Sequence, residues 1–185
     1  MHSGQTMLVI AAFVLLSTLT LSINSTMITS SNLGLEMEVN LNALSLGQSL
    51  LDEMLNKDFD ENTTGGRRIN VEAKASTILG PDAGEVITGA DIYPYKSKKI
   101  FDDFDDYNGY ERAANDSILG IFTIKAEVKY ADENTPDNNS LAKTFQKRAT
   151  ITVTHPNMTK DLRVANDTTV LPVVLKDLWV YRRFF

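Results

Sequence analysis

The chain has 185 residues, 43% of them apolar, which suits one globular domain of ordinary size with a further segment attached to it. Its formal net charge is −6, and it lacks the clustered Lys and Arg that phosphate binding requires, so we expect no nucleic-acid partner. The absence of cysteine excludes disulfides, thiolate zinc sites, a cysteine nucleophile and a lipid-modified cysteine anchor.

The N-terminal segment is uncharged, because residues 1–35 contain no Asp, Glu, Lys or Arg. Within it, residues 7–23 form an apolar run interrupted only by Ser and Thr, MLVIAAFVLLSTLTLSI. As a helix this run would reach roughly 25 Å, the short end of the length that crosses a bilayer. We therefore interpret residues 1–23 as a short leader and a membrane-competent half-helix. A cleaved secretory signal peptide is the alternative, although MHSGQT lacks its positive charge.

The helix is expected to continue through an amphipathic half over residues 24–60. Residues 24–56 contain no proline and only two glycines. Apolar positions and one Gln recur every three or four residues, which predicts one buried stripe made of Met37, Leu41, Leu44, Gln48, Leu51 and Leu55. A helix of about fifty residues would be roughly 75 Å long, so its first half must be buried in lipid or against other chains. Gly65 and Gly66 in ENTTGGRR predict its end.

Beyond this turn the periodicity becomes two, which predicts strands in four segments, RINVEAKAS (68–76), GIFTIKAEVKY (120–130), KRATITVTH (147–155) and LKDLWVYRRFF (175–185). Each has one face to bury, as in an antiparallel sheet covered on a single side by the amphipathic half-helix. The expected fold class is α+β, a long N-terminal helix packed on a small antiparallel sheet in residues 61–185. Residues 79–117 are the least regular and form an acidic loop.

The stretch FDDFDDYNGY, residues 101–110, is the densest in potential ligands. With Gly109 at the glycine place of the twelve-residue calcium loop, Phe104 and Asn115 would fall at its first and last ligand places, which excludes that loop. A looser Ca²⁺ site stays open, because Ca²⁺ accepts oxygen ligands in flexible geometry. Its candidate ligands are Asp102, Asp103, Asp105, Asp106 and Asn108. The alternative is that Phe101, Phe104 and Tyr107 pack inward while the aspartates face water.

Enzyme chemistry finds little support in the sequence. A general acid and base need different, protected environments, whereas aspartates this close in a polar loop should meet the same solvent. His2 and His155, the two histidines, supply neither a triad nor a metal cluster. We expect no enzyme activity and no cofactor apart from the Ca²⁺ considered above. Six Asn-x-Ser/Thr sequons, which also fit ordinary loop composition, are candidate glycosylation sites at Asn24, Asn62, Asn115, Asn138, Asn157 and Asn166.

A helix that is half membrane-like and half amphipathic, joined directly to a small sheet, resembles the type IV pilins and type II secretion pseudopilins. LSLGQSLLDEMLNKDFDEN (44–62) resembles the helix end of minor pilin-like proteins. FDDFDDYNGY, the strand IFTIKAEVKY after it, and FQKRATITVTHP (145–156) resemble their acidic loop and two strands in the same order.

The resemblance implies a structural subunit of a type IV pilus or a type II secretion pseudopilus-like filament. Its partners would be copies of itself or other pilin-like subunits, the inner-membrane assembly machinery, and the membrane before assembly. It would lie in the inner membrane first and then in a periplasmic or extracellular filament. The filament-core helix would be formed by Met7, Leu8, Val9, Ile10, Phe13, Val14, Leu15, Leu16, Leu19 and Leu21.

The resemblance also implies cleavage by prepilin peptidase between Gly4 and Gln5. The leader MHSG has no basic residue, and Val9 would be the fifth mature residue, where the family usually has Glu. Such a departure is known for some minor subunits at filament tips, and it also fits a chain that is not processed. Two other functions stay open: a membrane-anchored extracytoplasmic β-rich binding module or adhesin that binds calcium, and a secreted domain with a cleaved signal peptide.

Overall fold

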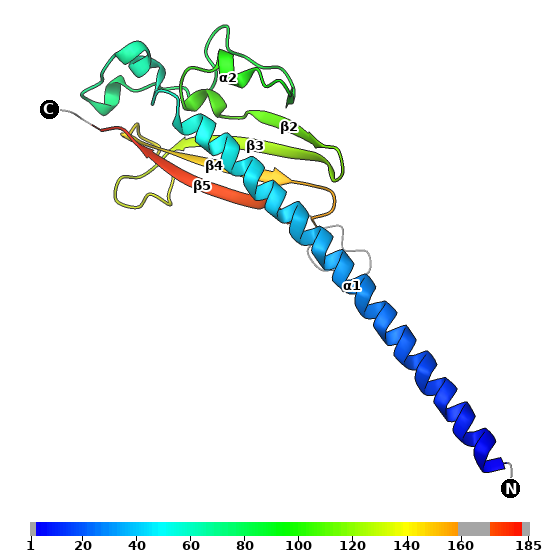
Figure 1. Cartoon of the computed structure of the whole chain (residues 1–185). Helices are drawn as coiled ribbons and strands as arrows, with labels where there is room; N and C mark the ends of the chain where they lie inside the picture. The colour runs from blue at the N-terminus through cyan, green and yellow to red at the C-terminus, as the bar shows by residue number, and fades with distance from the viewer. Residues whose placement is uncertain (1–2, 159–170, 183–185) are drawn as a thin grey trace. The chain divides into compact units, whose positions relative to one another are not determined.

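The computed structural model describes residues 3–158 and 171–182. It divides into two units, Met1–Glu38 and Val39–Phe185. Helix α1, Ser3–Leu55, supplies all of the described part of the first unit and continues into the second (Figure 1). Its 53 residues confirm the expected helix of about fifty.

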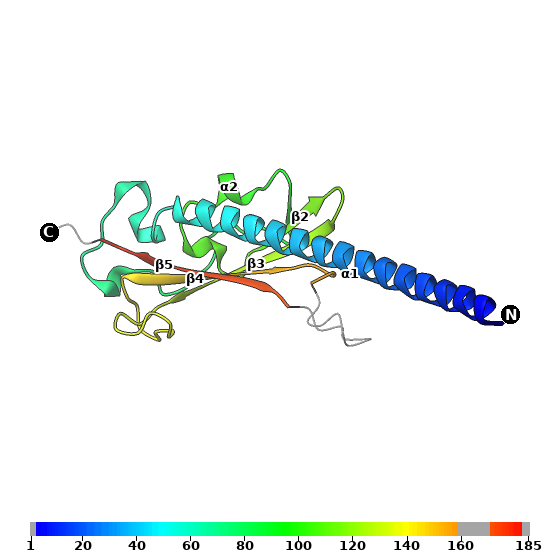
Figure 2. The ribbon, with the colours of Figure 1, turned by 60° about the horizontal axis from the view of Figure 1, so that its bottom comes forward.

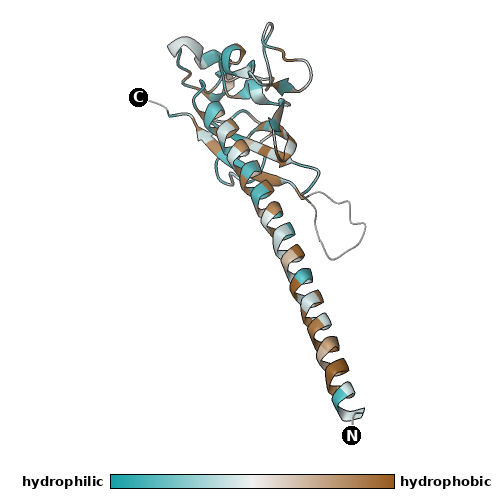
Figure 3. Cartoon of the chain, turned by 45° about the vertical axis from the view of Figure 1, so that its right-hand side comes forward, coloured by the Kyte–Doolittle hydropathy of each residue, from teal (hydrophilic) through white to brown (hydrophobic). Residues whose placement is uncertain are grey.

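In the first unit the apolar side chains of α1 are exposed, including all ten residues of the expected filament core. Figure 3 shows the hydrophobic colouring of this part of the helix. Several of its hydroxyl groups are satisfied within the helix, since Ser17 Oγ donates to Phe13 O at 2.8 Å and Thr20 Oγ1 to Leu16 O at 2.8 Å. Polar groups satisfied in this way are compatible with an apolar environment. Among the described residues, α1 is the one helix that is long and apolar enough to cross a membrane.

The second unit contains a mixed sheet with the order β1-β2-β3-β4-β5. Its described strands are β1 (Asp91–Ile92), β2 (Glu111–Asp116), β3 (Gly120–Tyr130), β4 (Gln146–Thr154) and β5 (Val173–Val180). The expected antiparallel pairing is correct from β2 to β5, but β1 pairs with β2 in parallel. The three expected strands at 120–130, 147–155 and 175–185 correspond to β3, β4 and β5, whereas β1 and β2 were not predicted.

The strand expected at 68–76 is wrong. This segment contains the short 3₁₀ helix η2, Glu72–Lys74, and Val71 in it is exposed. Ile69 and Ala75 are nevertheless buried, because they pack in a small hydrophobic cluster with Phe59, Tyr130 and Phe145. Burial at two positions of the alternating pattern thus comes from a coil that lies on the core, not from pairing in the sheet.

The predicted end of the helix is also displaced. Helix α1 ends at Leu55, and Gly65 and Gly66 instead close a separate 3₁₀ helix, η1, Glu61–Gly66. Asp60 caps η1, because its side chain accepts from Asn62 N while Thr63 completes a capping box. The N-cap Asp60, five residues before Gly65, therefore starts a new helix in place of continuing the old one.

One face of the C-terminal half of α1 covers one face of the sheet (Figure 2). The buried residues of this face are Val39, Ala43, Gly47, Leu50, Leu51 and Met54. The predicted stripe is mostly wrong, since Met37, Leu41, Leu44 and Gln48 are exposed, Leu51 is buried and Leu55 is half-buried. Small residues decide which face is buried: a Cβ on Gly47 would lie 2.7 Å from Leu175 Cδ1 and 3.2 Å from Val153 Cγ2.

The core between the helix and the sheet confirms the alternation read from two strands. Phe122, Ile124, Ala126 and Val128 of β3 are buried together with Ala149, Ile151 and Val153 of β4. The register pairs Ile124 with Val153 and Ala126 with Ile151. Tyr130 of β3 is buried in the second cluster. The acidic stretch completes the core through η3, Asp105–Tyr107, and follows the short helix α2, Ser97–Ile100.

Candidate functional site

The acidic stretch has its aromatic rings where the sequence predicts them. Phe101, Phe104 and Tyr107 are buried in the main core, and Phe101 and Tyr107 meet edge to face with ring centroids 4.8 Å apart. The expectation that the aspartates face water is wrong for three of the four. Asp103, Asp105 and Asp106 are each 2% exposed, and only Asp102 is exposed.

The local backbone explains this burial. Asp103 Oδ1 accepts hydrogen bonds from the backbone N–H of Asp105 at 2.8 Å and of Asp106 at 3.1 Å. Asp106 Oδ2 accepts from the backbone N–H of Asp102 and Asp103, both at 3.1 Å. Reciprocal capping of this kind satisfies the turn and draws the carboxyl groups inward with the rings. The carboxyl groups therefore occupy different environments, contrary to the expectation that they meet the same solvent.

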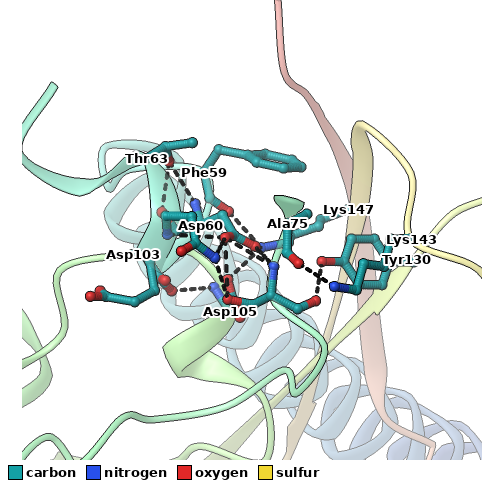
Figure 4. Close-up of polar contacts among 12 residues, drawn as sticks. Phe59, Asp60, Thr63, Ala75, Asp103, Asp105, Tyr130, Lys143 and Lys147 are labelled. Atoms are coloured by element: carbon teal, nitrogen blue, oxygen red, sulfur yellow. Dashed lines mark hydrogen bonds and ion pairs between the residues drawn. The ribbon is translucent and has the colours of Figure 1, made fainter. Parts of the chain in front are cut away.

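Lys147 is a buried cation that the sequence analysis missed. It lies on β4 at the inward register that Ala149, Ile151 and Val153 also occupy, and its side chain is 0% exposed. Lys147 Nζ donates to Phe59 O at 2.8 Å, to Asp60 Oδ2 at 2.7 Å and to Asp105 Oδ1 (Figure 4). These acceptors match the three N–H bonds of an ammonium group. The alternation of β4 could have shown that Lys147 faces the core.

Asp60 is the ionised partner in this site. Burial alone would raise the pKa of Asp60, but the charge and hydrogen bond of Lys147 outweigh it and hold the pKa below its ordinary value. The backbone N–H of Ser76 at 2.9 Å and that of Asn62 at 3.1 Å act in the same direction. Asp60 is thus an anion held by η1 and by the segment that follows it.

Asp103 and Asp105 behave differently from Asp60. Burial raises the pKa of Asp103 to about 9, and the charges of Asp105 and Asp106 add to the effect. Burial also raises the pKa of Asp105, although the charge of Lys147 opposes it. The backbone N–H of Asp105 donates to Asp103 Oδ1 at 2.8 Å, so the two residues are adjacent. Asp103 is therefore a neutral carboxylic acid at pH 7 that lies beside the Asp105 and Lys147 pair.

The five predicted calcium ligands do not converge. Asp105 pairs with Lys147, and Asn108 serves the backbone, since its Nδ2 donates to Leu79 O at 2.9 Å and its Oδ1 accepts from Val128 N at 3.1 Å. Asp102 is placed instead in two groups of three carboxylates whose ligand atoms lie within 4.8 Å of one another. One group is Glu61, Asp102 and Asp103, and the other is Glu85, Asp102 and Asp106.

The group with Glu85 has the stronger electrostatic conflict. Burial raises the pKa of Glu85, and the charge of Asp102 raises it further. Burial also raises the pKa of Asp106, to about 7, and the charge of Glu85 contributes to this increase. Glu85 Oε2 is buried without a hydrogen-bond partner. Three carboxylates that repel one another would supply part of the oxygen coordination that Ca²⁺ takes. Glu61 and Glu85 were missed because they lie far from residues 101–110 in sequence.

A second buried polar network joins α1 to β2 and α2. Arg112 Nη2 lies 2.7 Å from Glu53 Oε2, and Ser97 Oγ and Tyr107 Oη donate to Glu53 Oε1 at 2.8 and 2.9 Å. Tyr110 Oη donates to Asp91 Oδ2 at 2.9 Å. Every member has a partner, so this network fixes the loop of residues 79–117 on the helix.

The remaining predicted positions stay separate from these networks. Gly4 and Gln5 lie in the first turn of α1. Asn24, Asn62, Asn115, Asn138 and Asn157 are exposed, with Asn24 in α1 and Asn115 in β2, and Asn166 lies outside the described residues. His155 is buried, with Nε2 3.0 Å from Leu119 O, and His2 lies outside the described residues.

No protein-family model, curated protein or solved structure matches this chain. Its function has to be inferred from its own residues.

Proposed function

We propose that this chain is a structural subunit of a type IV pilus or type II secretion pseudopilus-like filament, and that it assembles through the apolar half of α1. The observation that carries the proposal is an N-terminal segment of 35 uncharged residues that continues without a linker into the half of α1 packed on the sheet. This role needs helix burial and no bond-making, so the proposed protein is not an enzyme.

The energetic argument rests on the exposed side chains of α1. Phe13, Leu15 and Leu16 are 64%, 70% and 60% exposed in a single chain. Burying a large apolar side chain completely is worth about 1.5–3 kcal/mol. Lipid satisfies this demand before assembly, and neighbouring copies of the same helix satisfy it in a filament. The second unit also has exposed apolar side chains on α1, at Leu41 and Leu44.

The proposed role also includes a cellular location and a route of assembly for the chain. The chain would be held in the inner membrane, would be processed between Gly4 and Gln5, and would pass with the assembly machinery into a periplasmic or extracellular filament. Val9 would then occupy the place of the usual Glu, which fits a minor subunit at a filament tip. The mass of the native N-terminal peptide tests this step, because cleavage leaves Gln5 first whereas a removed signal peptide leaves a terminus near Ile23.

Site-specific cross-linking tests assembly directly, because the natural chain has no cysteine and any introduced thiol is unique. A Leu16→Cys chain should form cross-links between copies, or with other subunits, inside isolated filaments visible by electron microscopy. The matched control is Ile78→Cys, at an exposed apolar residue of the second unit. Recovery of both variants only in membranes, never in a filament fraction, would contradict the proposal.

The second candidate is a membrane-anchored binding module that uses calcium, and the group of Glu85, Asp102 and Asp106 favours it. Here α1 would be only a tether, so a protease should cut readily within residues 24–56. Calorimetric titration with calcium should show binding to the wild-type protein, and Glu85→Gln should weaken the affinity. Protection of residues 24–56 in the native assembly, together with no heat of calcium binding, would exclude this candidate.

A further inference from the structure

We propose that Lys147 and Asp105 form an intramolecular isopeptide bond, in which Lys147 Nζ replaces one carboxyl oxygen of Asp105 and a water molecule is released. The bond would join β4 to η3, between residues 42 apart in the sequence. It is a covalent modification inside the second unit and is independent of the proposed role in a filament.

The geometry places the two reacting groups in contact and away from water. Lys147 Nζ touches Asp105 Oδ1, and the two side chains are 0% and 3% exposed. The rings of Phe59 and Tyr130 flank the nitrogen, with centroids 4.5 and 5.6 Å from it. Figure 4 shows the contacts of Lys147 with Asp60 and Asp105. A nitrogen held against a carboxyl group in this way has the proximity that converts a bimolecular step into an intramolecular one.

Two observations select Asp105 over Asp60 as the acyl group. Asp60 accepts hydrogen bonds from Asn62 and Ser76 as well as from Lys147, which stabilises its anion and makes it a poor electrophile. Among the described residues, the Asp105 side chain accepts from Lys147 Nζ without the backbone donors that Asp60 has, and its backbone N–H donates to Asp103 Oδ1 at 2.8 Å, which places the Asp103 carboxyl group beside it. Asp60 therefore orients the amine through its 2.7 Å contact, and Asp105 is the carboxyl group that reacts.

The step balances without any co-reactant. One ammonium proton of Lys147 passes to the Asp105 carboxylate, which leaves an amine and a carboxylic acid. The nitrogen lone pair attacks Asp105 Cγ, the C–N bond forms, and the C–O bond breaks. The departing hydroxyl takes up a proton from Asp103 while Asp103 accepts the second nitrogen proton, so Asp103 ends unchanged. The products are one secondary amide and one water.

The buried environment drives the reaction toward the amide. Condensation removes the charges of Lys147 and Asp105, and with them the cost of burying that pair. The Asp60 carboxylate keeps its hydrogen bonds from Asn62 N, Ser76 N and Ser76 Oγ. The amide keeps one N–H donor, and its carbonyl oxygen is an acceptor for the Asp103 carboxyl group. In a chain without disulfides, the new bond closes the acidic loop on the sheet and restricts the unfolded chain as a disulfide would.

Mass spectrometry of the purified full-length protein tests the bond. We expect a mass lower by one water than that of the linear chain that begins at the observed N-terminus, and a branched tryptic peptide that contains Asp105 and Lys147. The K147R chain, which keeps the cation, should show the full mass. The control K125R removes a lysine 3.2 Å from Glu111 at the surface and should keep the deficit of one water.

Two further variants separate the roles of the carboxyl groups. The D105N chain should release ammonia in place of water and reach the same final mass as the wild type. The D60N chain should release no ammonia, because residue 60 does not react, so its final mass should differ from that of the wild type. D103N should convert at least tenfold more slowly, since it lacks the proton relay, and an undiminished rate would overturn that role. Unmodified, separate peptides for Asp105 and Lys147 in the folded wild-type protein would overturn the isopeptide proposal itself.

Discussion

Burying the Lys147 ammonium removes its hydration, a cost of several kcal/mol that the surrounding contacts must offset. Phe59 O, Asp60 and Asp105 provide these contacts, and all of them come from segments that follow α1 or form the acidic loop. Lys147 is therefore the residue at which the helix end, the acidic loop and the sheet are joined. Either an ion pair or an amide to Asp105 would keep this junction.

Replacing Lys147 with Met should destabilise the protein by about 3–5 kcal/mol at pH 7, because it leaves the carboxylates of Asp60 and Asp105 buried without their partner. Urea unfolding in detergent, followed by tryptophan fluorescence, measures the change. Lys125→Met is the matched control at an exposed ion pair and should shift the free energy of unfolding by less than about 0.5 kcal/mol. Equal changes in the free energy of unfolding for both variants would contradict the role of Lys147 in joining the helix end, the acidic loop and the sheet.

Asp106 should make stability depend on pH. Its folded pKa of about 7 lies above the ordinary value of 3.8, so the folded state holds a proton that the unfolded state releases. The stability from this proton is complete below about pH 4 and is lost as pH rises to about 7, an effect of up to roughly 4 kcal/mol. Asp106→Asn keeps an acceptor oxygen but does not ionise, so the decline should flatten.

Thermal unfolding between pH 4 and pH 8 checks the Asp106 prediction, with Asp137→Asn as a control at an exposed loop residue. The control should reproduce the wild-type profile. An Asp106→Asn profile that declines as steeply as the wild type would show that this proton is not the cause. Added calcium should raise wild-type stability at pH 8 if Glu85, Asp102 and Asp106 bind it as a group.

At the scale of elements, the contact between α1 and the sheet depends on Gly47, where the helix lies against Val153 of β4 and Leu175 of β5. A search for large apolar side chains finds Leu41 and Leu44 instead, and these face away from the sheet. Apolar residues mark a surface that can be buried, and small residues mark where another backbone approaches. The two kinds of residue therefore mark two different surfaces of this helix.

Gly47→Leu should destabilise the second unit by about 1–3 kcal/mol, because even a Cβ at this position would lie 2.7 Å from Leu175 Cδ1. The measurement is urea unfolding in detergent. Ser45→Leu adds the same side chain at an exposed position of the same helix and should leave the free energy of unfolding within about 0.5 kcal/mol. A Gly47→Leu protein as stable as Ser45→Leu would show that the helix does not sit this close.

Strands whose alternation is long could be predicted from the sequence, and short ones could not. β3 and β4 alternate over eleven and nine residues, so their inward faces were identified correctly. β1 has two residues, and β2 is ERAAND, whose short and polar side chains give no strand pattern. Residues 68–76 show the alternating pattern in sequence but do not pair in the sheet. Of the apolar residues in this pattern, Ile69 and Ala75 are buried, and they pack in the small hydrophobic cluster.

At the scale of the whole molecule, the candidate site was only half predictable, because its members come from distant parts of the chain. The density of aspartates in residues 101–110 identified the loop. Its partners Asp60 and Glu85 are brought to it by the fold, and nothing in their local sequence marks them. The alternation of β4 indicates that Lys147 faces the core, but not which carboxyl groups it meets. The uncharged half of α1 differs from the site, because its residues are consecutive in sequence and its apolar, helical character could be predicted from composition alone.

The proposed filament role predicts that a charge in the uncharged half of α1 blocks assembly without disturbing the second unit. Leu16→Lys places an ammonium group where lipid or neighbouring helices should bury the side chain, at a cost of about 2.5–3.5 kcal/mol near a bilayer centre. Filament yield, measured by electron microscopy and immunoblotting of sheared filaments, should fall at least tenfold.

The control for Leu16→Lys is Ile78→Lys, which adds the same charge at a side chain that is 82% exposed in the second unit. Its filament yield should stay close to the wild type. Because residue 16 belongs to the first unit, urea unfolding of the second unit should be unchanged in the Leu16→Lys protein. Normal filament yield from Leu16→Lys would mean that this part of the helix meets water in the assembled state, which would overturn burial of α1 as the basis of assembly.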